Sequence, residues 1–133
     1  MKHGLALLSA AALVVACSEA VAPIDPVWGK VPCASCGMIV GDRRFAAQLL
    51  TERGDRYFYD DPGCLVHHLD EKKPAVAGMW VREAAGDRWL SARAARYAKA
   101  SARTPMDFGF EARADEGVPF DAFAQQIRER KPR

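Results

Sequence analysis

The chain has 133 residues, a length typical of one domain, with 50% hydrophobic and 27% charged residues. Its 19 lysines and arginines nearly balance 17 aspartates and glutamates, which leaves a formal net charge of +2. So small a charge does not indicate a nucleic-acid-binding surface, and we expect no nucleic-acid partner.

The first 16 residues predict an export signal. A basic start, MKHG, precedes the apolar run LALLSAAALVVA, which ends at Ala16. This run is shorter than the roughly 20 residues that span a bilayer, so the pattern predicts a secretory signal rather than a transmembrane helix. The ending LVVAC is similar to a bacterial lipobox and predicts that Cys17 is lipidated. Acyl chains on Cys17 would anchor the protein on a membrane, facing the periplasm, and Ser18 after it favours the outer membrane.

The residues after Cys17 predict a linker. The stretch SEAVAPIDPVWGKVP holds three prolines and has neither a helical nor a strand period. We therefore expect a lipid-anchored linker over 17–30, with Trp28 packed onto the domain, and a folded domain over 31–133.

The first half of the domain predicts a hairpin and a helix. FAAQLLT and RYFYD flank a turn at Gly54, which is typical of a β-hairpin. A helix should then begin at Pro62 and end near Glu71, before Pro74.

The second half predicts a similar order. MWVREA and RWLSA flank another glycine-containing turn, and FGFEARA alternates like a strand. ARYAKA is ambiguous between strand and helix, whereas VPFDAFAQQIRER has apolar residues at helical spacing. The predicted fold class is α+β, as two small units that each combine a strand hairpin with a helix.

Sulfur atoms gather in VPCASCGMIV, residues 31–40. Cys33, Cys36 and Cys64 make an odd number of cysteines after Cys17, so at least one thiol stays unpaired. One interpretation is a thiol oxidoreductase that uses the Cys33-x-x-Cys36 pair. Such a pair usually begins a helix, whereas GMIV is strand-like.

A second interpretation is a structural zinc site in an interaction module. Cys33, Cys36, Cys64 and His67 form a C-x₂-C…C-x₂-H pattern of the kind that binds zinc tetrahedrally. The pattern gives no role to the methionines.

A third interpretation is a Cu(I) site, because thiolate and thioether ligands select this soft ion. Cys36 and Met38 lie two residues apart and would share a face of an extended segment, with Gly37 allowing the backbone to bend. From the residues alone all three interpretations stay open.

Five residues receive structural interpretations. Asp60 and Asp61 precede the predicted helix and are expected to cap it. His67 and His68 point about 100° apart on a helix, so only one can face a given site, and packing or solvation is expected for them. Met79 is expected in the core.

Three motifs in order behind the lipobox resemble the NosL family, copper-chaperone lipoproteins associated with nitrous oxide reductase. They are CASCGM, YFYDDPGC and TPMDFG, and the similarity runs to about Ala112. The resemblance implies an α+β fold related to organomercurial lyase. It also implies a non-enzymatic, periplasm-facing protein that delivers one Cu(I) to a copper enzyme, most often nitrous oxide reductase, alongside a membrane ABC-type complex.

The resemblance also implies ligands. The Cys-Gly-Met motif indicates Cys36 and Met38, TPM indicates Met106, and Cys33 is an additional candidate as ligand or redox partner. Pro105 and Gly109 would shape the loop of Met106. At two positions the resemblance implies no ligand. Cys64 matches the Gly-Cys position, but no ligand role is carried over to it. Asp107 stands where many relatives have glycine.

Overall fold

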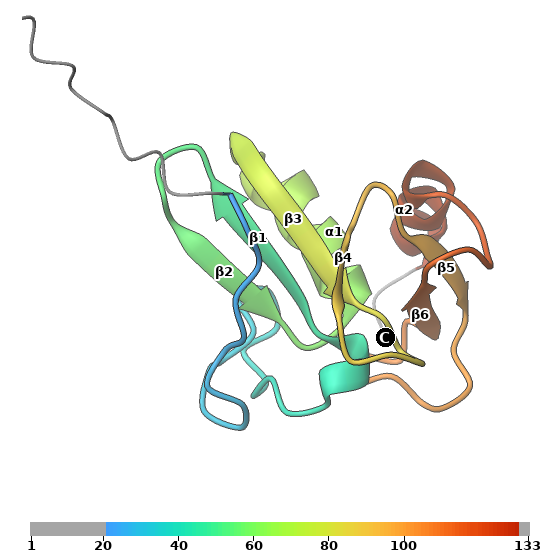
Figure 1. The fold of residues 1–133 in the computed structure, drawn as a ribbon. Helices are drawn as coiled ribbons and strands as arrows, with labels where there is room; N and C mark the ends of the chain where they lie inside the picture. Colours follow the sequence, from blue (N-terminus) through green and yellow to red (C-terminus); the bar gives the residue numbers. More distant parts are fainter. Residues whose placement is uncertain (1–20, 131–133) are drawn as a thin grey trace, which may run out of the picture.

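The computed structural model describes residues 21–130, so the predicted signal peptide and Cys17 lie outside the described residues. Figure 1 shows a larger sheet with a helix behind it, beside a smaller sheet and another helix. In chain order the elements are the 3-10 helix η1 (Arg43–Phe45), β1 (Ala47–Thr51), β2 (Arg56–Tyr59), α1 (Pro62–Lys72), β3 (Val76–Arg82), β4 (Trp89–Ser91), β5 (Arg96–Lys99), β6 (Phe110–Arg113) and α2 (Phe120–Glu129).

The α+β prediction is confirmed, and both predicted hairpins form. They share one antiparallel sheet of order β2-β1-β3-β4, because β3 pairs with β1 and places Leu49 opposite Met79. The ambiguous segment ARYAKA contributes β5, which pairs with β6 in the second sheet. The two hairpins are thus joined edge to edge rather than each forming a unit of its own.

Helix boundaries follow from local chemistry. Asp61 caps α1, Pro62 occupies its first position, and Lys73 closes it in the left-handed conformation, one residue before Pro74. Such a start and stop are what capping and proline sterics favour. The second helix, α2, buries the four apolar residues that its sequence spaces helically: Phe120, Phe123, Ala124 and Ile127.

The core lies between the sheets and the helices. Leu49, Met79 and Val81 are buried on one face of the larger sheet together with Leu65 of α1, and the predicted core position of Met79 is confirmed. In the smaller layer the ring of Tyr97 stacks on Phe123 at 4.0 Å between centroids. No helix within residues 21–130 combines the length and apolar character needed to cross a membrane.

The other face of the larger sheet is covered by the chain's own N-terminal segment, 21–30. Figure 1 shows this segment running down the front of the sheet, in blue. The fully buried amide of Gln48 accepts from the Ile24 N–H at 3.1 Å and donates to the Ile24 carbonyl at 2.8 Å. Arg56 donates to the carbonyl of Ala22 at 2.9 Å. The described part of the predicted linker is therefore held against the domain, and we call it the strap.

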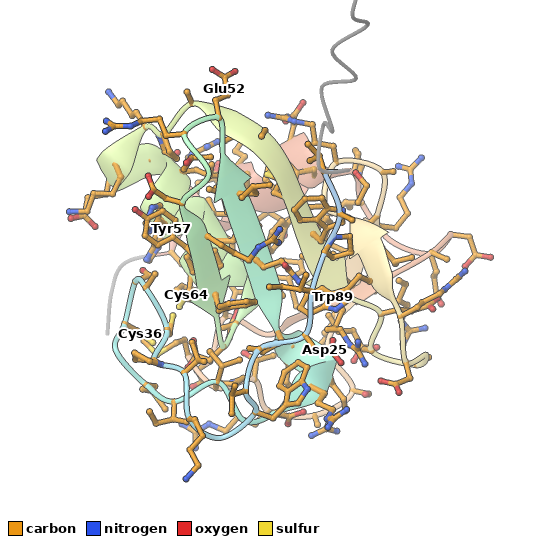
Figure 2. All side chains as sticks on the ribbon, turned by 60° about the vertical axis from the view of Figure 1, so that its left-hand side comes forward. Asp25, Cys36, Glu52, Tyr57, Cys64 and Trp89 are labelled. Atoms are coloured by element: carbon orange, nitrogen blue, oxygen red, sulfur yellow. The ribbon has the colours of Figure 1, made fainter. Side chains whose placement is uncertain are left out.

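The buried side chain of Arg82 holds the C-terminal half of the strap against the sheet. The guanidinium of Arg82, whose residue is only 4% exposed, lies over the rings of both Trp28 and Trp89 and donates to Asp25 at 3.3 Å. Trp89 also donates to Asp25 at 2.8 Å, and Figure 2 shows these two side chains together where the strap crosses the sheet. The expected packing of Trp28 onto the domain is confirmed by its stacking on Trp89.

Replacing Gln48 by alanine is expected to lower the free energy of unfolding by about 2 kcal/mol, because both polar groups of Ile24 lose their buried partner. Urea denaturation measures this loss, and amide hydrogen exchange of residues 22–26 should become faster. The control is Gln125→Ala, at an exposed position of α2, expected to be within about 0.5 kcal/mol of the parent. Equal effects of the two variants would contradict the role of the strap.

Candidate metal centre

The loop of residues 33–38 presents the thiols of Cys33 and Cys36. It is closed by hydrogen bonds from the Cys33 N–H to the Met38 carbonyl at 2.7 Å and from the Gly37 N–H to the Cys33 carbonyl at 2.9 Å. Gly37 has a φ of 78°, a conformation that glycine adopts without steric cost. The Ala34 N–H donates to the carbonyl of Phe58 in β2, which docks the loop at the end of that strand.

The junction between β2 and α1 supplies the other side of the site. Cys64 lies in the first turn of α1, and Asp60 lies between the strand and the cap. The ligand atoms of Cys33, Cys36, Cys64 and Asp60 all lie within 4.8 Å of one another. Figure 2 shows Cys36 and Cys64 side by side at this end of the sheet. We call these four residues the thiol cluster.

Asp60 is the member of the cluster that sequence analysis missed. It was expected to cap the helix with Asp61, but only Asp61 does so, by accepting from the Gly63 N–H at 2.9 Å. Asp60 is buried and instead accepts from the Cys36 thiol at 3.3 and 3.5 Å. Adjacent residues in extended backbone point to opposite sides, so a pair of aspartates before a helix can serve two sites. That alternation is the signal which would have separated their roles.

Hydrogen bonding and burial shift the pKa values of the ionisable groups in the cluster. The hydrogen bond between Cys64 and Cys33 lowers the pKa of Cys33 to about 4 and raises that of Cys64. Burial raises the pKa of Cys36 to about 12 and that of Asp60 to about 6. The hydrogen bond between Cys33 and Cys64 therefore favours the thiolate at Cys33 and the thiol at Cys64, and a thiolate in this position suits a cation.

Met106 reaches the same place from a distant part of the chain. An open cavity of about 810 Å³ is lined by Cys36 and Cys64 together with Met106 and Phe108. The loop that carries Met106 is tied to α1, because the Met106 N–H donates to Asp61 at 3.1 Å. Pro105 also lines the cavity, and Asp107 and Gly109 both have a positive φ. Asp107 thus occupies the backbone conformation that glycine adopts most readily, at the position where the resemblance implies glycine.

His67 and His68 face different surroundings, as their adjacent positions on a helix predict. His67 lies one turn after Cys64, lines the cavity and packs edge-on against Phe108 at 5.0 Å between centroids. His68 is buried against the rings of Tyr57 and Tyr59. Asp60, rather than His67, joins the three thiols, so the zinc pattern predicted from the sequence does not assemble as written.

Met38 is placed differently from the geometric expectation. Residues 34–36 form a turn and Gly37 has its positive φ, so Cys36 and Met38 do not lie on one face of an extended segment. Met38 is 48% exposed and is not among the residues that line the cavity. Its ligand role stays a prediction, while Cys36 and Met106 share the cavity and Cys33 lies in the cluster behind it.

The Cys33-x-x-Cys36 pair also differs from the oxidoreductase pattern. It lies in a turn followed by the single bridge between Pro32 and Ile39, and no helix within the described residues begins at the pair. All three cysteines that the structure describes are free thiols.

The fold and the thiol cluster together define a class: an α+β domain with a sulfur-rich cluster whose ligand atoms are close enough to hold a metal ion. Among solved structures, the chain is similar to the crystal structure of the copper chaperone NosL from Shewanella denitrificans. The TM-score is 0.59 at 16% identity, over 78% of this chain and 87% of that one, so the likeness is one of fold. No protein-family model matches the chain, and no curated protein matches it.

Proposed function

We propose that this protein is a copper chaperone that binds one Cu(I) at the sulfur-lined cavity and passes it to another protein. The observation that carries the proposal is that one cavity is lined by sulfur-bearing residues from three separate segments, Cys36, Cys64 and Met106, with Cys33 in contact range behind Cys36. Thiolate and thioether sulfur together select Cu(I) over harder metals. The structural relative supports the same function, since it is a protein described as a copper chaperone.

The cellular setting belongs to the same proposal. A signal peptide over residues 1–16 and a lipid on Cys17 would place the protein on a membrane, facing the periplasm, with the outer membrane favoured. The recipient would be a copper enzyme, nitrous oxide reductase above all, assembled with a membrane ABC-type complex. The resemblance of three sequence motifs to the NosL family supports this setting.

The reduced full-length protein is expected to take up one Cu(I), measured by competition with a chromophoric Cu(I) chelator. Cys36→Ser should weaken binding by at least about tenfold, because Cys36 belongs to both the thiol cluster and the cavity wall. Met79→Leu is the control, since Met79 is buried in β3 and does not line the cavity. A parent protein that takes up no Cu(I), or a Cys36→Ser variant that binds like the parent, would contradict the proposal.

A structural zinc site is the second candidate, and the thiol cluster itself favours it. Three thiols and one carboxylate within 4.8 Å of one another suit a tetrahedral divalent ion. Elemental analysis of the protein as purified separates the two functions. Stoichiometric zinc that Cu(I) cannot displace, with unfolding on its removal by a chelator, would support the zinc module and reject the chaperone.

A further inference from the structure

We propose that the cavity holds two overlapping stations for the copper ion, an inference that rests on the proposed function. The inner station consists of the thiols of Cys33, Cys36 and Cys64. The outer station consists of Cys36 and Met106 at the cavity wall. Cys36 belongs to both, so the ion can move from one to the other without ever losing its bond to this sulfur.

Burial separates the two stations. Cys33 is 3% exposed and Cys64 is 1% exposed, whereas Cys36 and Met106 are only half-buried. Cys33 does not line the cavity, although its sulfur lies within 4.8 Å of that of Cys36. An ion among the three thiols is therefore shielded from solvent on the Cys33 side and reachable from the cavity side. A partner can approach it through the cavity, whose wall carries Cys36 and Met106.

The ligand chemistry of the stations differs in the same direction. Each thiol of the inner station that binds the ion does so as thiolate: its S–H bond breaks, the proton leaves to water, and a copper–sulfur bond forms with no change of oxidation state. Methionine contributes a neutral thioether, which binds without releasing a proton. Replacing an inner thiolate by Met106 weakens the attraction between the ion and its ligands. The inner station is thus suited to retention and the outer station to release.

The loop that carries Met106 is held against α1. The Met106 N–H is held by Asp61, the residue that caps the helix bearing Cys64. The neighbouring Phe108 packs against that helix, since a Cβ added at Gly63 would lie 2.3 Å from its ring. Thr104 closes the loop by accepting from the Gly109 N–H at 3.1 Å. The outer sulfur and the inner thiol of Cys64 are therefore carried by one connected piece of structure.

The two stations predict that retention and release respond to different substitutions. In the reduced full-length protein, Cys33→Ser and Cys64→Ser should each lower the Cu(I) affinity by at least about tenfold. Met106→Leu should lower the affinity by less than about threefold but slow the transfer of Cu(I) to bathocuproine disulfonate by about tenfold. Met79→Leu is the matched methionine control for both measurements.

X-ray absorption of the copper-loaded parent and of copper-loaded Cys64→Ser adds a direct readout of the number of sulfur ligands. Three sulfur neighbours in the parent and two in Cys64→Ser support the inner station. Two sulfur neighbours in the parent overturn the inference, as do equal losses of affinity in Met106→Leu and Cys64→Ser. Parent-like binding in both Cys33→Ser and Cys64→Ser, with binding lost in Cys36→Ser, overturns the inner station while leaving the chaperone function intact.

Discussion

Replacing Asp61 by alanine is expected to lower the free energy of unfolding by about 2 kcal/mol. The carboxylate accepts from two backbone N–H groups, those of Gly63 in α1 and of Met106 in the distant loop. Alanine leaves both groups without their acceptor inside the protein. Part of the loss is offset, because burial raises the pKa of Asp61 and the charged carboxylate is itself costly to bury.

Urea denaturation of parent and variant gives the change in stability, and hydrogen exchange of the Met106 amide reports on the loop directly. Asp42→Ala is the matched control, because Asp42 also caps a helical turn but is partly exposed, and its carboxylate accepts from Arg44, two residues away. Asp42→Ala should lower the free energy of unfolding by less than about 1 kcal/mol. Equal losses in the two variants, or a Met106 amide that exchanges as in the parent, would show that Asp61 does not join the loop to the helix.

The second prediction concerns Gly63, where helix propensity and packing oppose each other. An alanine in place of a helical glycine ordinarily stabilises by about 0.5–1 kcal/mol. Here the new Cβ would lie 2.3 Å from the ring of Phe108, so either the ring and its loop or the helix must move. Overpacking of this kind costs about 1–3 kcal/mol, so we expect a net destabilisation of about 1 kcal/mol.

Because Phe108 lies two residues from Met106, displacement of the ring should also disturb the outer sulfur. Gly63→Ala is therefore expected to slow Cu(I) transfer together with its loss of stability. Gly41→Ala serves as the control, since Gly41 has ordinary backbone angles and only one atom within 4 Å of an added Cβ. If Gly63→Ala were more stable than the parent, the loop would not pack on α1 as described.

The local elements were predictable because their causes are local. Gly54 in the first turn, Pro62 at the helix start and the spacing of Phe120, Phe123 and Ile127 act within a few residues of themselves. Neither the pairing of β3 with β1 nor the strap has such a local signature. The strap is held by Gln48 and Arg82, polar residues whose buried roles depend on partners more than twenty residues away.

The candidate site was likewise predictable only in part. Residue type and spacing identified Cys33, Cys36 and Cys64 as candidate metal ligands, whereas Met106 came only from the resemblance of its TPM motif. Asp60 was missed because a carboxylate before a helix is usually a cap, and only its direction towards Cys36 reveals another role. The shared face of Cys36 and Met38 was assumed for extended backbone, which the turn at residues 34–36 does not provide.

The sequence by itself determined which sulfur atoms the protein has and where its hairpins and helices lie, since both follow from residue type and short-range spacing. The tertiary structure decided which of those sulfurs meet. Cys64 joins Cys33 and Cys36 because α1 begins where β2 ends, beside the loop that docks on Phe58. Met106 reaches their cavity because Asp61 holds its loop to the same helix, and contacts between residues so far apart in the chain have no local pattern to predict them.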